Sequence, residues 1–390
     1  MTKFKSSMDK LIREEIAFGH IKGAACRVIH KGKVIYDTLQ GYADAEQGRK
    51  MQADTIFRLF SMTKPVTAVA TMILMERGLI DLREPVSKYL PEFANQKVWQ
   101  ENGELQDADR DVTIYDLLNM TSGIPYPDIT HEPGRQMDAL FRELIGRREQ
   151  GEIVTTREYM RRIAEVPLVF QPGERWLYGL SADVLGGLVE VVSGMPYGEF
   201  LRKEIFEPLD MKDTGFYVPE DKIPRFAVAY DERKEPGHLI PFTESHLGEY
   251  YGEDVAFESG GCGLVSTLED YSHFALMLLN GGTYNGKRIL GPKTVEFMAK
   301  DRLSDAQKVS FVWDTLWGYG YGCLMRVFLE DGKAMQNGSA GEFGWDGWTG
   351  NYVMIDPQED LVMLYFIQRV DSGTLPVVRK LRNVIYGALR

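Results

Sequence analysis

The sequence is poor in the residues that build metal centres and disulfide frameworks. Only 3 cysteines and 6 histidines occur among 390 residues, and they lie far apart in the chain. No Cys-x-x-Cys and no His-Glu-x-x-His spacing is present. Cys26 stands in an apolar run, where a small core residue is the expected role. We therefore expect neither a metal site nor a disulfide framework.

Basic residues and long apolar runs are also scarce. The chain has 45 Lys and Arg against 57 Asp and Glu, which gives a formal net charge of -12. This dispersed acidic charge argues against nucleic acid and anionic membranes as partners. No apolar run reaches the length of about 18 residues that a membrane span needs. Residues 1–10 carry charge but lack the apolar core of a secretory signal, so we expect a cytoplasmic globular protein.

Periodic apolar residues and turn signals outline the expected helices and strands. Apolar runs at 24–30 and 34–40 flank a Lys-Gly-Lys turn, which is typical of a β-hairpin. Residues 95–111 are polar and predict a surface excursion, and residues 200–260 predict long loops. We expect helices at 8–17, from Ser61 to Gly78, and at 113–120, 134–150, 156–165, 181–193, 267–279 and 376–389, and further strands at 321–328, 351–356 and 361–369.

The order of these elements predicts the fold class. Strands near both chain ends with helices between them favour the α+β class. We expect one sheet built from both ends of the chain and flanked by helices. A discontinuous sheet domain would comprise residues 1–85 and 200–390, and a mainly helical subdomain would comprise residues 86–199. The sequence contains no internal repeat and no linker composition.

Ser61 and Lys64 form a Ser-x-x-Lys tetrapeptide at the start of a strongly helical segment. Residues three apart on a helix share one face, with Cβ atoms about 5–6 Å apart. An amine beside a hydroxyl can take its proton and make the oxygen a reactive nucleophile. The positive end of the helix dipole also favours an anion that forms there. The tetrapeptide is a weak signal alone, because it occurs by chance in most long chains.

Tyr178 is a candidate partner for this pair. It follows a Pro-Gly turn and precedes a helix, a position from which a side chain can face a cleft. A phenol is a poor base at neutral pH, but a nearby ammonium group such as that of Lys64 favours its phenolate form. A buried tyrosine hydrogen-bonded to the backbone would satisfy the same pattern.

The segment 341–350 is rich in glycine and tryptophan and precedes an expected strand. Glycine lets a backbone approach a ligand closely, so its N–H groups can bind an oxyanion. A tight aromatic-lined turn explains the composition equally well. The Gly-x-Ser-x-Gly signature occurs around none of the serines, which disfavours an α/β-hydrolase.

Taken in order, these segments resemble the serine hydrolases of the class C β-lactamase and penicillin-binding-protein superfamily. The pattern is most similar to the β-lactamase-like carboxylesterases of family VIII. Trp345-Asp346-Gly347 stands where these esterases carry Trp-Gly-Gly and β-lactamases carry Lys-Thr-Gly. The segments that carry the resemblance are 57–68, 117–124, 172–178, 183–186, 260–267 and 345–347, which span nearly the whole chain.

The resemblance implies a β-lactamase/transpeptidase-like fold, with an antiparallel sheet and an active site between sheet and helical subdomain. It implies Ser61 as the acylated nucleophile, Lys64 as its activating partner and Tyr178 as a proton shuttle. The backbone N–H groups of Ser61 and Trp348 would form the oxyanion hole. Whether Lys64 or Tyr178 is the primary base stays open, because coupled groups share their protons.

The chain departs from the family pattern at positions that touch substrate. Leu180 replaces the Asn of the β-lactamase Tyr-x-Asn motif, and Trp345 replaces the Lys of Lys-Thr-Gly. Both changes favour neutral, more apolar esters over carboxylated substrates. Asp346 stands where glycine is usual, and it either selects an amine-bearing substrate or turns toward solvent or an arginine. We expect Trp345, Asp346, Gly347 and Tyr126 to bind substrate.

We therefore predict a serine carboxylesterase for small to medium neutral esters that works through an acyl-enzyme without metal or organic cofactor. The same machinery would serve an amide hydrolase (a D-aminopeptidase, an amidase or a weak β-lactamase) or an acyltransferase. A non-catalytic binding scaffold is the alternative of another class, and the presence of all three catalytic side chains argues against it. The expected partner is a small ester or amide, and the oligomeric state stays open.

Overall fold

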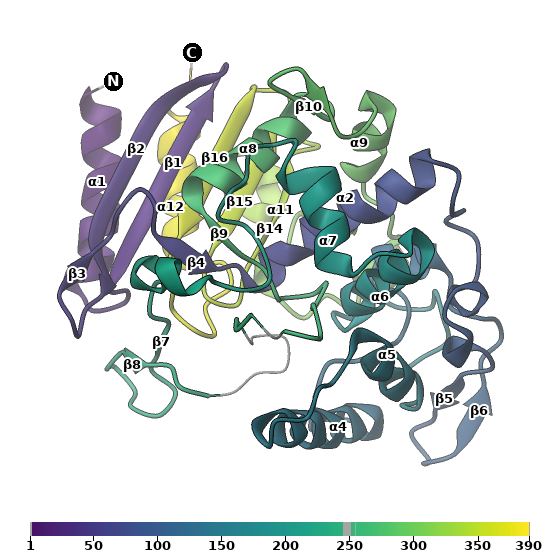
Figure 1. Cartoon of the computed structure of the whole chain (residues 1–390). Coiled ribbons are helices and arrows are strands. Elements are labelled where there is room, and N and C mark those ends of the chain that lie inside the picture. Colours follow the sequence, from purple (N-terminus) through teal and green to yellow (C-terminus); the bar gives the residue numbers. More distant parts are fainter. Residues whose placement is uncertain (1, 245–250, 254, 390) are drawn as a thin grey trace.

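A single antiparallel sheet forms the centre of the molecule. The computed structural model describes residues 2–244, 251–253 and 255–389. Within this part, the eight-stranded sheet has the order β12-β13-β14-β15-β16-β1-β2-β3. Its strands are β1 (Gly23–His30), β2 (Lys33–Asp44), β3 (Arg49–Lys50), β12 (Tyr319–Gly322), β13 (Met325–Phe328), β14 (Phe343–Asp346), β15 (Tyr352–Asp356) and β16 (Leu361–Phe366). The N-terminal strand β1 pairs with the C-terminal strand β16, so both chain ends build one sheet (Figure 1).

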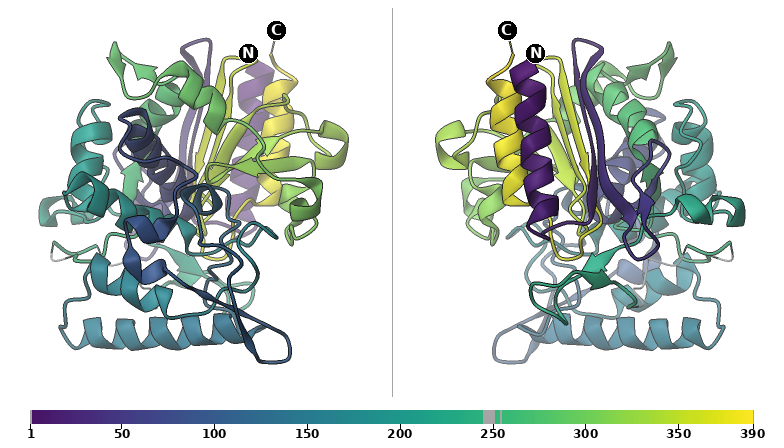
Figure 2. Two further views of the ribbon diagram at one scale, coloured as in Figure 1. Left: turned by 90° about the vertical axis from the view of Figure 1, so that its right-hand side faces the viewer. Right: turned by 90° about the vertical axis from the view of Figure 1, so that its left-hand side faces the viewer.

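Both faces of the sheet are covered by helices. Along β16, Leu364 and Phe366 face one core, whereas Met363 and Tyr365 face the other, as the two-residue period of a strand requires. Helices α1 (Thr2–Ala17) and α12 (Pro376–Tyr386) lie side by side on one face (Figure 2). Helix α8 (Leu268–Leu279) packs on the opposite face. Because both faces are buried, the central strands are apolar throughout rather than alternating.

Helices α2, α4, α5, α6 and α7 lie on the side of the sheet that α8 covers, away from α1 and α12 (Figure 1). The central helix α2 (Thr63–Glu76) is buried from Thr63 to Leu74 and contacts α6. The others are α3 (Ile114–Leu118), α4 (Glu132–Glu149), α5 (Thr156–Ala164), α6 (Ser181–Ser193), α7 (Tyr197–Leu201), α9 (Pro292–Met298), α10 (Asp305–Lys308) and α11 (Asp331–Ala334). Short two-stranded sheets join β4 (Ile56–Arg58) to β9 (Val265–Thr267), β5 (Lys97–Trp99) to β6 (Leu105–Asp107), β7 (Tyr230–Asp231) to β8 (Ile240–Pro241), and β10 (Thr283–Tyr284) to β11 (Lys287–Arg288).

The expected α+β fold with an antiparallel sheet is confirmed, while several elements differ from the prediction. The expected strand 321–328 is a hairpin, because Cys323 and Leu324 both adopt positive φ and reverse the chain between β12 and β13. The polar segment 95–111 contains the β5–β6 hairpin, and β14 begins inside the segment expected to be a glycine-rich loop. Helix α1 begins before residue 8.

The middle of the chain contains short strands between its loops. The loops expected at 200–260 include β7 and β8, and residues 245–250 and 254 of this range lie outside the described residues. The division into 1–85 with 200–390 and 86–199 stays a prediction. Among the described residues, no helix has the length and apolar character required to cross a membrane.

Candidate active site

Ser61 lies in a 3-10 turn, Phe60–Met62, that runs directly into α2. Phe60 has a φ of 47°, a left-handed conformation that a bulky aromatic residue rarely adopts. Such a conformation costs about 1–2 kcal/mol, and it persists only where the surroundings enforce it. The Phe60 ring is buried and packs edge-on against Trp348 at 5.2 Å. This strained turn places Ser61 on the lining of a cavity instead of inside the helix core.

The amine of Lys64 is fully buried and contacts the Ser61 hydroxyl. Its Nζ lies 3.1 Å from Ser61 Oγ and donates to Tyr126 Oη at 2.9 Å and to the Gly261 carbonyl at 2.8 Å. Burial raises the pKa of Tyr126 well above its usual value, so the Tyr126 hydroxyl stays protonated and accepts from Lys64 through a lone pair. These contacts hold the amine toward the Ser61 oxygen.

The buried carboxylate of Asp183 is linked to Lys64 through the backbone of Gly261. Asp183, on α6, accepts from Ser259 Oγ at 2.5 Å and from the Gly261 N–H at 3.2 Å. Gly261 thus links the two side chains, because its N–H donates to the Asp183 carboxylate and its carbonyl accepts from Lys64 Nζ. Burial raises the pKa of Asp183, and the Ser259 hydrogen bond and the Lys64 charge oppose that rise. Asp183 is a positioning residue, which the sequence prediction included only as part of a matching motif.

Tyr178 lies beside Lys64 and is held by an indole. Lys64 Nζ is 4.7 Å from the centroid of the Tyr178 ring, and the Trp345 Nε1–H donates to Tyr178 Oη at 3.0 Å. The Tyr178 ring also contacts Tyr126 at 5.6 Å and Trp313 at 5.0 Å. The structure therefore brings together the three side chains expected to be catalytic, and Lys64 is hydrogen-bonded to Ser61.

The end of β14 lies against the turn that carries Ser61. The Gly347 N–H donates to the Asn351 carbonyl at 2.8 Å, and Asn351 Nδ2 donates to the Arg58 carbonyl at 2.6 Å. A Cβ on Gly347 would stand 2.3 Å from the Leu59 carbonyl oxygen, so only glycine permits this approach. Trp348 and Ser61 line the same cavity. Their assignment as oxyanion-hole donors stays a prediction that this proximity favours.

We expect Gly347→Ala to damage both stability and activity. The added methyl group meets backbone rather than a flexible side chain, so the free energy of unfolding should fall by about 1–3 kcal/mol. Denaturant unfolding would measure this change. Gly146→Ala is the matched control, since a Cβ at this position in α4 meets nothing within 4 Å and should raise stability by about 0.5–1 kcal/mol. Wild-type stability in Gly347→Ala would contradict the close approach.

The cavity at Ser61 has a volume of about 540 Å³ and aromatic walls. Tyr178, Trp313, Trp345 and Trp348 line it, together with apolar residues of the segment 312–316. Trp345 and Trp348 belong to the segment 341–350, which was expected to approach the ligand. Gly347 and Tyr126 are not on the lining, and Tyr126 contacts Lys64 instead. The segment 312–316 carried no motif, so sequence reasoning missed this wall.

Asp346 faces the cavity but is paired with an arginine. Arg326 Nη1 donates to Asp346 Oδ2 at 2.6 Å and to Thr374 Oγ1 at 3.1 Å, and the Thr374 hydroxyl also donates to Asp346. Burial opposes the charged form of Arg326, but Asp346, Tyr352 and Tyr319 together outweigh it and raise the pKa of the guanidinium. This contact corresponds to the sequence alternative in which Asp346 turns toward an arginine, and Arg326 was not predicted.

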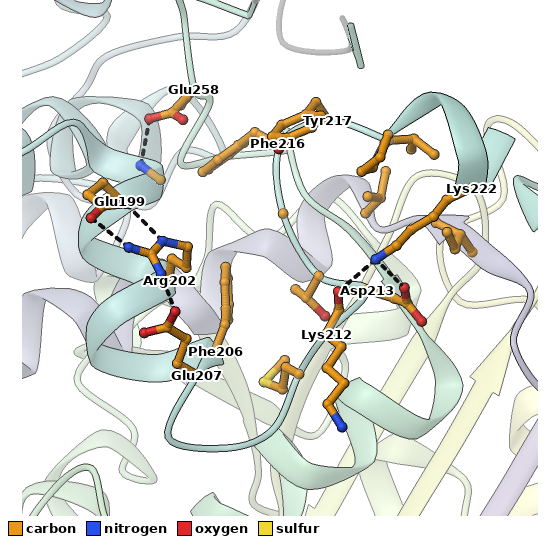
Figure 3. A pocket seen from close by; sticks show the side chains of 18 of the residues that line it. Glu199, Arg202, Phe206, Glu207, Lys212, Asp213, Phe216, Tyr217, Lys222 and Glu258 are labelled. Carbon is orange, nitrogen blue, oxygen red and sulfur yellow. Dashed lines mark hydrogen bonds and ion pairs between the residues drawn. The ribbon is translucent and has the colours of Figure 1, made fainter. Parts of the chain in front are cut away.

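A second, larger cavity of about 720 Å³ shares no lining residue with the Ser61 cavity (Figure 3). Its cationic side chains are paired with carboxylates. Arg202 pairs with Glu199 at 2.7 Å and with Glu207, and Lys222 pairs with Asp213 at 2.7 Å. Within the described part of the chain, no cluster of three or more His, Cys, Asp or Glu side chains is arranged to hold a metal ion.

The chain is similar to known proteins over most of its length. The chain is 32% identical to esterase EstB of Burkholderia gladioli, over 97% of this chain and 93% of EstB. It is 30% identical to acyltransferase mokF of Monascus pilosus, over 77% of this chain and 71% of mokF. The solved structure of EstCE1, a hydrolase with promiscuous acyltransferase activity, matches with a TM-score of 0.81 at 24% identity and covers 99% of both chains. The family model described as Beta-lactamase matches residues 8–386, so this protein belongs to the Beta-lactamase family.

Proposed function

We propose that this protein is a serine carboxylesterase that hydrolyses small to medium neutral esters through an acyl-enzyme. The observation that carries the proposal is the Ser61–Lys64 contact of 3.1 Å beside an aromatic cavity of about 540 Å³. The identity to EstB over nearly the full length of both chains supports an esterase. The cytoplasmic location and the small-molecule partner expected from the sequence stay predictions.

Acylation begins when Ser61 Oγ attacks the ester carbonyl carbon. The hydroxyl proton moves to the neutral amine of Lys64, and the new C–O bond makes the carbonyl oxygen an oxyanion. The N–H groups of Ser61 and Trp348 stabilise that oxygen; one such donor is worth about 2.7–4 kcal/mol. The bond to the leaving alkoxide then breaks, and Tyr178 hands the alkoxide a proton that Lys64 replaces. The acyl group remains on Ser61.

Deacylation repeats these steps with water. A water molecule attacks the acyl carbon, gives its proton to the Lys64–Tyr178 pair and releases the carboxylic acid, while Ser61 Oγ recovers a proton. The buried position of Lys64 keeps its amine at a fixed distance from Ser61 in both halves of the cycle. Such positioned proton transfer contributes about 10²–10⁴-fold to a rate.

The cavity walls favour a substrate that is neutral near the scissile bond. Trp345, which replaces the lysine of β-lactamases, is buried and presents an indole there. The charge of Asp346 is held by Arg326, so it is not free to select an amine. Aromatic faces suit apolar acyl or aryl groups. Acyl transfer to an alcohol is a second candidate function, favoured by the identity to mokF.

A substrate panel tests the proposal. p-Nitrophenyl butyrate, nitrocefin and a D-alanyl amide would be mixed in parallel with the protein and analysed by intact-protein mass spectrometry and turnover. We expect a butyryl adduct and turnover with the ester and far slower reaction with the other two. Preference for the amide or the β-lactam would overturn the carboxylesterase assignment, and an added alcohol that captures the acyl group would favour the acyltransferase.

Tyr178→Phe should lower kcat by about 10²–10⁴-fold while the fold stays intact. The change removes the hydroxyl that accepts a hydrogen bond from Trp345 Nε1–H but keeps the contact between the two rings. Steady-state kinetics and circular dichroism would check both statements. Tyr321→Phe is the matched control, since the Tyr321 ring also contacts Trp345 at 5.2 Å and its hydroxyl has no hydrogen-bond partner among the described residues. Equal rates in the two variants would contradict a proton shuttle at Tyr178.

A further inference from the structure

Exposed apolar side chains gather in one stretch of the chain. Among the described residues, five large apolar side chains within residues 309–335 are exposed, and the segment 309–317 carries four of them. Val312 is 79% exposed and Trp317 is 55% exposed. Single exposed apolar residues are normal on a protein surface, whereas a cluster marks an interaction site. We call this cluster the apolar rim, and its members are Val309, Val312, Trp313, Trp317 and Met335.

The apolar rim borders the cavity at Ser61. Val312 and Trp313 line that cavity. Trp317 and Met335 line an adjoining cavity of about 220 Å³, which shares four lining residues with the cavity at Ser61. Because Val312 and Trp313 are both exposed and on the lining, the cavity opens to solvent at the rim. A substrate that enters there passes apolar side chains on its way to Ser61.

The segment that carries most of the rim is anchored to the residues before Tyr178. Ser310 Oγ donates to the Trp176 carbonyl at 2.8 Å and accepts from the Trp176 N–H at 3.0 Å. The Phe311 ring packs edge-on against Trp176 at 4.9 Å. The Trp313 ring packs edge-on against Trp176 at 5.7 Å and Tyr178 at 5.0 Å. These contacts fix the backbone of the segment, so its exposed side chains form a surface of the folded protein.

The charge around the rim favours a neutral surface over an anionic one. Lys308 and Lys333 flank most of the rim in the sequence, and each is paired with a carboxylate. Asp314, which lies between the two rim tryptophans in the sequence, is exposed. The whole chain has a formal net charge of -12, so an anionic lipid surface would repel it.

The position of the rim also limits what can occupy it. A partner protein or a second copy of the chain seated on the rim would cover the opening of the cavity at Ser61 and block access to it. An apolar substrate phase on the rim instead delivers substrate into that cavity. Tryptophan suits such a boundary, because its ring is apolar and its N–H can stay in contact with water.

We propose that the apolar rim binds the surface of aggregated neutral esters, as droplets or micelles, and that the protein hydrolyses esters taken from that surface. Contact of the rim side chains with the ester phase removes apolar area from water, which stabilises the bound state. This inference rests on the proposed esterase function and specifies the physical form of the preferred substrate.

Hydrolysis of tributyrin across its solubility limit tests the proposal on the whole protein. The rate would be measured by pH-stat titration, first with dissolved ester and then with droplets. We expect the rate to rise above the saturation curve of the dissolved ester once droplets form. A rim variant that combines Val309→Ser, Trp317→Ser and Met335→Ser, none of which lines the cavity at Ser61, should lose this excess by roughly tenfold or more. Its kcat/KM for dissolved p-nitrophenyl butyrate should equal that of wild type.

The matched control makes the same kind of substitution at other exposed apolar positions. It combines Phe18→Ser, Leu105→Ser and Ile153→Ser, which are 71%, 55% and 71% exposed and are absent from the lining of both cavities. This variant should keep the excess rate. A wild-type rate that stays on the dissolved-ester curve above the solubility limit, or an equal loss in the two variants, would overturn the proposal.

Binding by an inactive variant separates the rim from the esterase function. Ser61→Ala, with and without the rim substitutions, would be mixed with a tributyrin emulsion, and the bound fraction would be measured by flotation. Rim-dependent binding supports the proposal even if no ester turns over, which would count against the proposed function alone. Equal binding of the two proteins would overturn the proposal, as would a rim-dependent dimer in sedimentation that does not bind droplets.

Discussion

Ser61→Ala should abolish the acyl-enzyme and lower ester turnover by about a millionfold, the cost typical of removing a serine nucleophile. The methyl group cannot attack the ester carbonyl, and Lys64 keeps its contacts with Tyr126 and Gly261. The lost Lys64–Ser61 hydrogen bond is worth only about 0.5–1.5 kcal/mol, so the variant should fold. Intact-protein mass spectrometry after mixing with p-nitrophenyl butyrate would show the adduct in wild type only.

A second serine provides the control for this experiment. Ser87 is half-buried, donates to Asp111 Oδ2 at 2.6 Å and is not on the lining of the Ser61 cavity. Ser87→Ala should therefore acylate as wild type does. Near-normal turnover or a persistent butyryl adduct in Ser61→Ala would contradict the assignment of Ser61 as the nucleophile and would indicate that another residue is acylated.

Lys64→Met should lower kcat/KM by at least about 10²–10⁴-fold, because the group that takes the Ser61 proton is lost. Methionine fills a similar volume and leaves no buried unpaired charge, which limits the damage to the fold. The Gly261 carbonyl and the Tyr126 hydroxyl each lose a donor and stay buried, at a cost of about 1–3 kcal/mol per group. Steady-state kinetics and thermal unfolding would measure the two effects separately.

Lys64→Arg distinguishes a proton acceptor from a fixed positive charge. Arginine keeps the charge but is not deprotonated in proteins. If Lys64 accepts the Ser61 proton, the arginine variant should be as inactive as Lys64→Met. Substantial activity in Lys64→Arg would show that charge alone suffices and would move the base role to Tyr178. Tyr126→Phe, which removes one of the partners of Lys64, should have a much smaller effect on the rate.

Part of the fold and of the candidate site was predictable because the signals are local. The three-residue spacing of Ser61 and Lys64 on a helical start already implies a shared face, and the structure has the two side chains in contact. The apolar runs of β1, β15 and β16 and the glycine that ends α6 are likewise local signals. The turn at Cys323 and Leu324 carries no glycine or asparagine, so the β12–β13 hairpin had no such signal.

The pairing of distant residues was not predictable from local pattern. Arg326 and Asp346 meet because β13 pairs with β14, with Arg326 opposite Gly344. The two-residue period of the strands then places Asp346 on the same face as Gly344. Arg379 reaches the same region through α12, a helix whose apolar face packs on the sheet. Neither arginine belongs to a recognisable motif, so no local pattern pointed to the Arg326–Asp346 pair.

The sequence by itself determined the class of the fold and indicated Ser61, Lys64 and Tyr178 as candidate catalytic residues, because helix spacing, strand runs and ordered motifs are local features of the chain. Only the tertiary structure decided which charges are paired and which side chains line the cavity at Ser61. The reason is physical: solvation and ion pairing depend on distances between elements, and those distances are set by sheet register and helix packing rather than by neighbouring residues.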